Sequence, residues 1–499
     1  MSVGKSIKHE SAIQHVTGAA KYVDDQLKIE GLVSCWPVMS EYARAQLISI
    51  NSKAALAIDG VLTVITAKDI KGKNDTGAII NDEVLLPDHE ISYANQAIAW
   101  VVAESEDIAR QAAGKVSVEL KELKPILTIK DAIKNKSFHG GPQKMARGNP
   151  KKALKAADYQ LTDEFEMGGQ DHFYLETHAS WVIPDNEGNY KVYSSTQHPS
   201  ETQATVAHVL GIASNKVVCV SPRMGGGFGG KESQANPFAA IAALAAKKTA
   251  RPARVRLSRS LDMKLTGKRH PLLAKYKLGF SKTGKIQALD IKLYSDAGWS
   301  TDLSHAIMQR SLFHIDNSYF IPDISVTGYA CKTNKTSQTA FRGFGGPQSI
   351  VIIENIIDDI ARTLNMPADK VRELNFYKEG QETHYGQVLN NVRLQKVWKL
   401  AKSNSKFSKR QTAIRKFNAK NKYKKRGLAI TPLKFGISFT FTILNQAGAF
   451  ILIYTDGSIQ LNHGGTEMGQ GLHTKMLQVA AASLGVSYER FRVMPTATD

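Results

Sequence analysis

The most informative stretch of this chain is Arg223-Met224-Gly225-Gly226-Gly227-Phe228-Gly229-Gly230-Lys231-Glu232, because five of the six positions from 225 to 230 are glycine. Glycine has no Cβ, so a large ligand can approach the backbone of such a loop. The backbone N–H groups can face anionic oxygens, and Phe228 places a single ring within the run. We predict a cofactor-binding loop here, and a flexible surface turn is the alternative if this loop is taken alone.

Two further glycine-rich loops carry polar side chains at fixed places and support the first prediction. They are Thr339-Ala340-Phe341-Arg342-Gly343-Phe344-Gly345-Gly346-Pro347-Gln348 and His463-Gly464-Gly465-Thr466-Glu467-Met468-Gly469-Gln470-Gly471-Leu472-His473. Neither loop matches the phosphate-binding pattern G-x-x-x-x-G-K-[ST], and neither places G-x-G-x-x-G between a strand and a helix with an acidic residue following at the usual distance. The sequence therefore argues against nucleotide binding by the common routes.

Together the three loops resemble the cofactor loops of the molybdenum hydroxylases, and within that family the molybdopterin-binding region of the xanthine dehydrogenase/xanthine oxidase group. The similarity begins at His15-Val16-Thr17-Gly18, includes Gly168-Gly169-Gln170-Asp171-His172-Phe173-Tyr174-Leu175-Glu176-Thr177, and extends to the last loop, so that it covers almost the whole chain. The resemblance implies a molybdenum–molybdopterin cofactor that supplies the redox chemistry, while the protein supplies orientation and acid/base groups.

The resemblance and the hydrophobic pattern together predict an α+β fold. We expect an N-terminal α/β hammerhead-like domain followed by a mixed α/β molybdopterin-binding domain in two parts. Short apolar runs at 61–66 and 97–103 read as strands and 106–114 as a helix. The expected segments are the hammerhead-like domain 1–133, a linker 134–152, the first part of the cofactor domain 153–400, a basic connector 401–427, and a truncated second part 428–499.

The resemblance also implies which residues surround the cofactor. Gln197 corresponds to a residue that hydrogen-bonds the oxo ligand of the molybdenum, and the backbones of Phe228 and Arg342 correspond to groups that approach the metal's ligands. An amide can donate to such an oxygen without adding charge. From the residues alone, Gln197 would be a turn residue and Arg342 a surface charge. The expected cofactor-binding residues are Gly226, Gly227, Phe228, Gly229, Arg342, Gly343, Gly469 and Gln470.

The expected substrate residues also follow from the family's motif positions. Glu232 would hydrogen-bond a ring nitrogen while protonated, although it could instead cap the next helix. Arg310 would stabilise negative charge that develops on a substrate carbonyl oxygen. Phe344 and Phe439 would sandwich a flat substrate, with Thr440 beside them as a donor. Members that oxidise purines keep both charges, so the resemblance favours hydroxylation of hypoxanthine and xanthine to urate, in purine catabolism. The alternatives are an aldehyde oxidoreductase of the same family or an inactive, truncated cofactor-binding or assembly piece.

One expected group cannot be assigned in this sequence, namely the general base that deprotonates the metal-bound hydroxyl. In the family this carboxylate lies in a segment beyond the position that matches Asp499. Glu467 is the tempting substitute, but its motif position is a pterin contact. We therefore expect the chain to be inactive alone and to need the missing C-terminal portion as a partner.

Composition agrees with a soluble enzyme subunit. The chain has 499 residues and 42% hydrophobic residues, and its longest apolar run, 237–246, reads as a buried helix, so we expect no membrane association. The N-terminus lacks the apolar core of a secretory signal, so we expect a cytoplasmic protein. Cys35, Cys219 and Cys331 are far apart and cannot together ligate an iron–sulfur cluster. The family's 2Fe-2S and FAD centres, to which electrons pass, are therefore expected on partner chains.

The net charge of +20 is concentrated in one segment. Residues 402–426 contain eleven Lys/Arg and no Asp/Glu, with Phe407, Phe417 and Tyr423 interleaved. A solvated helix or loop explains this run better than a nucleic-acid surface, because charge runs are commonly exposed faces. We therefore regard nucleic acid as an unlikely partner.

Overall fold

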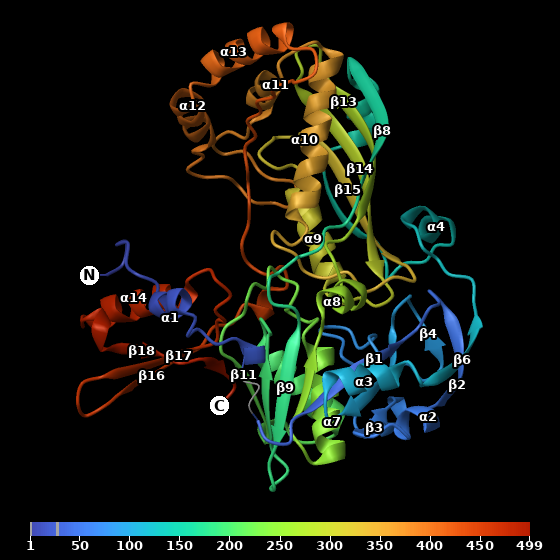
Figure 1. Ribbon diagram of the computed structural model, residues 1–499. Coiled ribbons are helices and arrows are strands. Elements are labelled where there is room, and N and C mark those ends of the chain that lie inside the picture. The colour runs from blue at the N-terminus through green and yellow to red at the C-terminus, as the bar shows by residue number, and fades with distance from the viewer. Residues whose placement is uncertain (1, 26–28) are drawn as a thin grey trace.

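The structure is a computed structural model that describes residues 2–25 and 29–499 (Figure 1). Within these residues the strands form four sheets, and the largest has eight strands. In sheet order these are β19 (Thr496–Ala497), β11 (Val217–Ser221), β10 (Tyr190–Ser194), β9 (Ala179–Pro184), β12 (Ala253–Arg256), β1 (Val33–Met39), β5 (Ala97–Ala103) and β3 (Val61–Ile65).

The eight-stranded sheet joins the N-terminal region to the later part of the chain. Strand β1 pairs in parallel with β12, with Val33 opposite Ala253, and antiparallel with β5. The strand run AIAWVVA of β5 is apolar throughout because six of its seven residues are buried between neighbouring strands and helices. The expected domain boundary at residue 133 stays a prediction, because the eight-stranded sheet contains strands from both sides of it.

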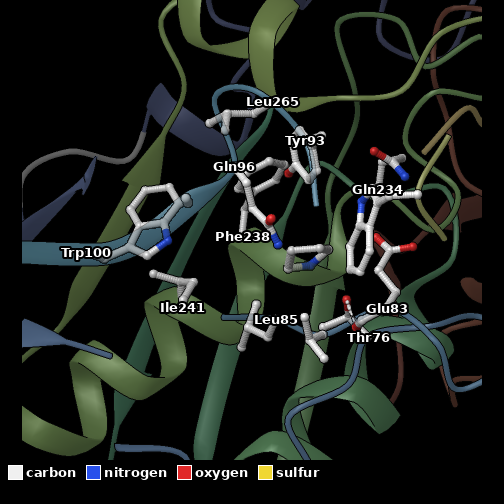
Figure 2. A pocket seen from close by; sticks show the side chains of 14 residues that line it. Thr76, Glu83, Leu85, Tyr93, Gln96, Trp100, Gln234, Phe238, Ile241 and Leu265 are labelled. Atoms are coloured by element: carbon white, nitrogen blue, oxygen red, sulfur yellow. Dashed lines mark hydrogen bonds between the residues drawn. The ribbon is translucent and has the colours of Figure 1, made fainter. Parts of the chain in front are cut away.

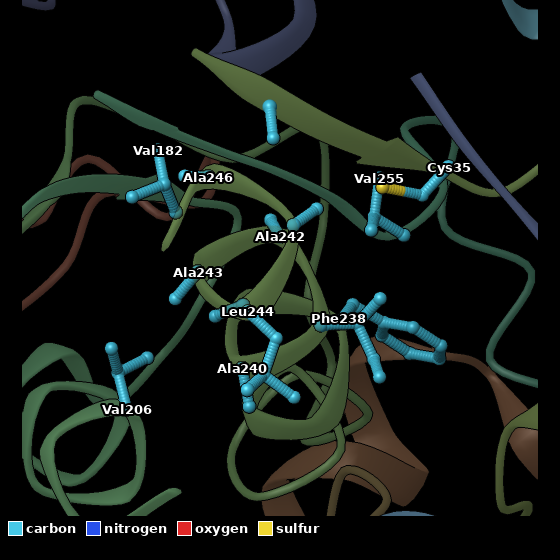
Figure 3. Close-up of a cluster of buried hydrophobic side chains, with 14 of the residues drawn as sticks. Cys35, Val182, Val206, Phe238, Ala240, Ala242, Ala243, Leu244, Ala246 and Val255 are labelled. Atoms are coloured by element: carbon cyan, nitrogen blue, oxygen red, sulfur yellow. The ribbon is translucent and has the colours of Figure 1, made fainter. Parts of the chain in front are cut away.

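Helix α7 (Asn236–Thr249) fills the core beside this sheet. Its run from Phe238 to Ala246 is buried and rich in alanine, and the small side chains let the helix approach β9 and helix α6 (Pro199–Leu210) closely (Figure 3). The predicted buried helix at 237–246 is confirmed. Because α7 follows the first glycine loop directly, its packing also fixes where that loop lies.

The second sheet has five strands and forms the other large layer (Figure 1). In sheet order they are β7 (Gln143–Arg147), β15 (Asp323–Lys332), β14 (Ile286–Gly298), β13 (Leu272–Phe280) and β8 (Tyr159–Met167). Strands β14 and β15 are parallel and are joined through helix α9 (Ser304–His314). Helix α10 (Gly346–Thr363) packs into the same core through the stripe Ile352, Ile356 and Ile360, as expected for a helix with period 3.6.

The structure differs from the expected linker at 134–152. This stretch contains strand β7, which pairs with β15 so that Arg147 lies opposite Ile324, and the start of helix α5 (Pro150–Ala156). The Gly and Pro signals at 140–142 and 148–150 are turns at the two ends of a short edge strand. An edge strand needs no continuous apolar run, so its polar sequence resembled a linker.

The basic connector at 401–427 is largely helical. It begins in α12 (Leu394–Asn404) and continues through α13 (Phe407–Lys420). Lys402 pairs with Asp369 at 2.7 Å and with Glu373 at 2.8 Å, while most of the other basic side chains of the segment are exposed. The interpretation as a solvated helix or loop agrees with this arrangement.

The remaining elements complete the molecule. Two small sheets consist of β16 (Ala449–Ile453), β17 (Ile459–His463) and β18 (Phe491–Val493), and of β4 (Glu90–Ile91), β2 (Ala45–Asn51) and β6 (Ser117–Glu122). The other α-helices are α1 (Ala12–Thr17), α2 (Lys53–Leu56), α3 (Glu106–Ala113), α4 (Ile129–Lys134), α8 (Arg259–Leu265), α11 (Ala368–Asn375) and α14 (Leu472–Leu484). In the described part of the chain, no helix combines the length and apolarity needed to cross a membrane.

Candidate functional site

The three glycine loops meet around one hollow of about 910 Å³. The fourth contributor is the 168–177 segment. The lining residues are Phe173, Leu175, Gly225, Gly226, Phe228, Gly229, Glu232, Ala340, Phe341, Arg342, Gly343, Phe344, Met468, Gly469 and Gln470. Segments nearly 300 residues apart in the chain thus form one concave site, as a large ligand requires.

The first loop needs glycine for close contacts within the protein as well as for access. A Cβ at Gly227 would lie 2.6 Å from Oε1 of Gln197. Gly229 has φ +94°, and a Cβ there would lie 2.9 Å from the carbonyl carbon of Ala340. Both distances are shorter than any real Cβ contact, so a side chain at either position would separate the loop from its neighbours. Gly469 differs, because open space adjoins it.

Gln197 holds the first loop with one end of its amide and leaves the other end free. Its Oε1 accepts hydrogen bonds from the N–H groups of Gly229 at 2.9 Å and Lys231 at 3.3 Å. Both partners are donors, so the oxygen must face the loop and the NH₂ group must point away. Among the described residues this NH₂ group has no protein acceptor. It can therefore donate to an oxygen of a bound ligand.

Phe228 and Arg342 connect the first loop to the second. The N–H of Arg342 donates to the carbonyl oxygen of Phe228 at 2.8 Å, and the carbonyl oxygen of Arg342 accepts from Arg269 at 3.1 Å. Phe228 adopts φ +53°, and its ring is 41% exposed at the wall of the hollow. The backbone N–H of Arg342 is thus already used within the protein, while the ring of Phe228 is available to a ligand.

The side chain of Glu232 provides the carboxyl group that lines the hollow. Burial, and then the nearby carboxyls of Asp302 and Glu201, raise its pKa to about 7 against the opposing effect of His198. A carboxyl group with this pKa is largely protonated below neutral pH, and it can then donate a hydrogen bond. Helix α7 begins at Asn236 with Ala235 as its cap residue, so Glu232 does not cap it.

Arg310 lies near the expected aromatic residues but has different partners from those expected. Its guanidinium donates hydrogen bonds to the carbonyl oxygens of Gly436 and Ser438. Its Cζ lies 5.7 Å from the centre of the Phe344 ring, and its side chain is almost fully buried, which lowers its pKa. Arg310 therefore holds the segment that carries Phe439 and Thr440, and two of its donors are committed there.

Phe344 and Phe439 contact each other directly in this structure. Their ring centres are 5.4 Å apart and their planes are inclined by 56°. A flat ring stacked between two others needs about 7 Å, which is twice the usual contact distance of about 3.5 Å. In this arrangement the two rings leave no room for a flat ring between them and present a tilted apolar wall. Their contact with substrate stays a prediction. The Oγ1 of Thr440 is buried without a hydrogen-bond partner in the described residues and remains available as a donor.

The carboxylate of Glu467 stabilises the third loop through hydrogen bonds. The carboxylate accepts hydrogen bonds from the N–H groups of Gly469 at 2.8 Å, Gly471 at 3.1 Å and His473 at 3.1 Å. Although burial alone raises its pKa, these three donors lower the pKa of Glu467 overall. The side chain of Gln470 also binds within the loop, to the backbone of Met468 and Thr466. Glu467 is thus fully engaged in the loop and is a poor general base.

A buried ion pair beneath the first loop was missed by the sequence analysis. Nζ of Lys231 lies 3.1 Å from Oε2 of Glu176, and Lys231 is completely buried. The same carboxylate accepts the N–H of Gly225 at 2.9 Å, and the Tyr174 ring lies 4.7 Å from Nζ. A lysine directly after a glycine run was the only signal, and its acidic partner is 55 residues away.

We expect Glu176→Gln to destabilise the protein strongly. Burial lowers the pKa of Lys231, and the glutamine would leave its ammonium group without a negative partner. Removing one partner of a buried pair typically costs about 3–5 kcal/mol. Chemical denaturation at pH 7 would measure the change in the free energy of unfolding. The exposed control Glu187→Gln should change it by less than about 0.5 kcal/mol, and an equally small change for Glu176→Gln would contradict the role of the pair.

Known proteins match this chain over almost its whole length. Family models described as molybdopterin cofactor-binding domains match residues 130–376 and 400–499, and the hammerhead domain of aldehyde oxidase and xanthine dehydrogenase matches residues 17–124. The xanthine dehydrogenase/oxidase of Gallus gallus is 44% identical over 499 residues, which are 100% of this chain and 37% of that protein. The xanthine dehydrogenase of Dictyostelium discoideum is 45% identical over 100% of this chain and 36% of its own length.

Solved structures show the same fold. The aldehyde oxidoreductase of Desulfovibrio gigas superposes with a TM-score of 0.86 at 26% identity, over 99% of this chain and 56% of that chain. The quinoline 2-oxidoreductase of Pseudomonas putida has a TM-score of 0.85 at 20% identity, over 100% of this chain and 67% of that chain. The chain spans little more than a third of the length of the curated relatives it matches. It belongs to the aldehyde oxidase and xanthine dehydrogenase family of molybdenum hydroxylases, as a hammerhead domain followed by two molybdopterin cofactor-binding regions.

Proposed function

We propose that this chain is the molybdopterin-binding catalytic portion of an enzyme that hydroxylates purines, converting hypoxanthine and xanthine to urate. The observation that carries the proposal is the Glu232 carboxyl, whose pKa lies near 7, in the hollow bounded by the three glycine loops. A purine offers ring nitrogens that accept a hydrogen bond from a protonated carboxyl, whereas a simple aldehyde offers none. The relatives named xanthine dehydrogenase support the same assignment.

The residues of the hollow fit a molybdenum–molybdopterin cofactor. The free NH₂ group of Gln197 can donate to an oxygen on the metal, and the open space beside Gly469 leaves room for the pterin. Phe228 and Arg342 would flank the metal's ligands, with Gly226, Gly227, Gly229 and Gly343 forming the adjoining backbone and Gln470 the third loop. When bound, the cofactor supplies the two-electron redox chemistry of the hydroxylation.

The chain's own residues then bind and polarise the substrate. Glu232 donates a hydrogen bond to a ring nitrogen and thereby orients the purine. The tilted rings of Phe344 and Phe439 cover its apolar edge, and Thr440 donates from beside them. Arg310 acts from the same side, and its positive charge stabilises negative charge that develops on the purine's carbonyl oxygen as the ring carbon is attacked.

We expect Glu232→Ala to impair purines far more than a small aldehyde. Loss of one buried hydrogen bond of this kind costs about 1–3 kcal/mol, or roughly 5- to 150-fold in kcat/KM for xanthine. Because the pKa of Glu232 lies near 7, the preference of the unmodified enzyme for purines should be greatest below neutral pH and fall as the pH rises through 7. Steady-state kinetics on both substrates across this range would measure it.

One control variant and one contrary outcome sharpen this test. Glu187→Ala removes an exposed carboxylate outside the hollow and should leave both substrates unaffected. Equal losses on xanthine and aldehyde in Glu232→Ala would show that the residue only supports the loop, and purine recognition would then have to be assigned elsewhere.

The aldehyde oxidoreductase reaction is the second candidate. The commitment of the Arg310 guanidinium to Gly436 and Ser438 favours it, because that arrangement leaves fewer donors for a purine oxygen. The kinetics of Glu232→Ala separate the two reactions, since an aldehyde enzyme would not need the carboxyl. An inactive cofactor-binding piece would give no turnover with either substrate.

In this proposal, other polypeptide chains or regions supply the electron acceptors. Cys35, Cys219 and Cys331 are buried and free, and the described residues contain no cluster of three potential metal ligands. We assign the 2Fe-2S and FAD centres to other chains or regions. Strand β16 supports a further protein partner, since Phe450 and Ile453 on it are 58% and 61% exposed. We also propose a cytoplasmic location, where such thiols stay reduced.

A further inference from the structure

A short segment, Ser300 to Asp302, connects the N-terminal domain to the glycine loops. On one side it is held by two acidic residues of the 75–86 loop. The Oγ of Ser300 donates to Glu83 at 2.7 Å, and Thr301 donates to Asp82 through its N–H at 3.0 Å and its Oγ1 at 2.6 Å. Both acidic residues lie about 220 residues earlier in the chain, within the match to the hammerhead domain.

On the other side, Asp302 binds both glycine-loop regions at once. Its carboxylate accepts hydrogen bonds from Ser233 at 3.0 Å, from Nε2 of Gln234 at 2.6 Å and from Thr339 at 3.2 Å. Ser233 and Gln234 directly follow Glu232, while Thr339 begins the second loop. Asp302 is only 3% exposed and has φ +43°, a conformation that costs free energy in a residue other than glycine.

A small cavity adjoins the segment Ser300 to Asp302, because Glu83, Gln234 and Trp299 are among its lining residues. Figure 2 shows Glu83 and Gln234 at the wall of a cavity of about 60 Å³, together with Tyr93 and Phe238. Burial raises the pKa of Asp302, while the hydrogen bonds from Gln234, Ser233 and Thr339 lower it and favour the carboxylate form. Burial, and then the charge of Asp302, raise the pKa of Glu83, so the protonated form of Glu83 is favoured beside Asp302.

We propose that Asp302 is a positioning residue for purine recognition, which fixes the Glu232 carboxyl relative to the second glycine loop. Its neighbours Ser300 and Thr301 are bound by Glu83 and Asp82 of the N-terminal domain. The proposal rests on the substrate-binding role proposed for Glu232. It gives the N-terminal domain a part in substrate specificity, although the domain contributes no residue to the lining of the hollow. The physical reason is that a single carboxylate satisfies donors from both loops, so neither loop can shift without leaving a buried donor unpaired.

The test compares Asp302→Asn with a double variant that reverses one hydrogen bond. The asparagine side chain would place an NH₂ group among three donors, and at least one of them would lose its acceptor. In Asp302→Asn/Gln234→Glu, the new carboxylate at position 234 can accept from the new amide at position 302, and it can still accept the N–H of Gly267, which Gln234 binds at 3.0 Å. The double variant keeps the size and the total charge of the pair. Asp185→Asn, in an exposed turn where Asp185 also accepts several hydrogen bonds, is the matched control.

Two measurements on the cofactor-containing enzyme judge the proposal. Hydrogen exchange of the backbone amides at 229–234 and 339–344 should speed up about tenfold or more in Asp302→Asn, because local opening becomes easier. The ratio of kcat/KM for xanthine to that for a small aldehyde should fall by roughly tenfold. The double variant should recover most of both effects, and the control should show neither.

The outcomes separate this proposal from the proposed function. Unchanged exchange in both loops, no recovery in the double variant, or equal losses on the two substrates would overturn the positioning role. If the unmodified enzyme oxidised aldehydes but no purine, the proposed purine function would fail, while the exchange data would still decide whether Asp302 fixes the loops.

Discussion

The 499-residue chain, loaded with its cofactor and assayed without further polypeptide, is expected to form urate from xanthine at least about 10²-fold more slowly than when the remainder of a relative is supplied. Among the described residues, the lining of the hollow contains a single carboxyl group, that of Glu232, and this group is proposed to donate a hydrogen bond in its protonated form. Glu467 is ionised but is engaged by three N–H groups of its own loop. Among the described residues of the hollow, no carboxylate is left for the role of general base once Glu232 is assigned to substrate binding. General-base assistance typically contributes roughly 10²–10⁴-fold.

The experiment requires that the two preparations contain equal amounts of the cofactor. Molybdenum and pterin contents should be equal in the preparation of the chain alone and in the complemented preparation, so that a low rate reflects chemistry and not loss of cofactor. Supplying the remainder of the Dictyostelium discoideum protein, outside the matched region, provides the complemented enzyme. Urate formation by the chain alone at a rate close to that of the complemented enzyme would show that a residue of this chain is the base.

The second large effect is expected for Arg310→Met, which should lower kcat for xanthine by roughly 10²-fold and leave aldehyde oxidation nearly intact. A fixed charge that acts on developing negative charge lowers the barrier more than it strengthens substrate binding, so kcat should change more than KM. The low exposure of Arg310 strengthens the effect, because its charge is poorly screened by solvent.

The hydrogen bonds from Arg310 to Gly436 and Ser438 suggest a competing explanation, in which the residue only holds the segment that carries Phe439. Loss of such support would raise KM for every substrate that contacts Phe439. Arg310→Lys separates the two roles, because lysine keeps the charge but cannot bind both carbonyl groups in the planar geometry of arginine. Partial recovery of kcat by lysine supports the electrostatic role. A change in KM alone, for both substrates, would rule it out. The exposed Arg362→Met is the control for removal of a positive charge.

Much of the fold could be predicted because its signals are local. The apolar runs of β3 and β5, the helices α3 and α7, and the three glycine loops are each visible within short stretches of sequence. Strand β7 was hidden, because a polar edge strand between glycine-rich turns has no such local signal. The continuity of the eight-stranded sheet was also hidden, because the pairing of β1 with β12 joins Val33 to Ala253, which lie far apart in the chain.

The site also combines features that have a local sequence signal with features that depend on contacts between distant segments. Phe228, Glu232, Arg342 and Gly469 lie in motifs that are visible in the sequence, and they line the hollow, whereas Gln197, Arg310, Phe439 and Thr440 are not among its lining residues. The roles of all these residues toward cofactor and substrate stay predictions. Only the tertiary structure decided their partners and states: Arg310 binds the backbone of Gly436 and Ser438, the rings of Phe344 and Phe439 touch, and Asp302 with Glu83 joins the N-terminal domain to the loops. The physical reason is that hydrogen bonds and pKa values depend on which groups folding buries together. Those groups come from segments 37 to more than 200 residues apart, so no local pattern records them.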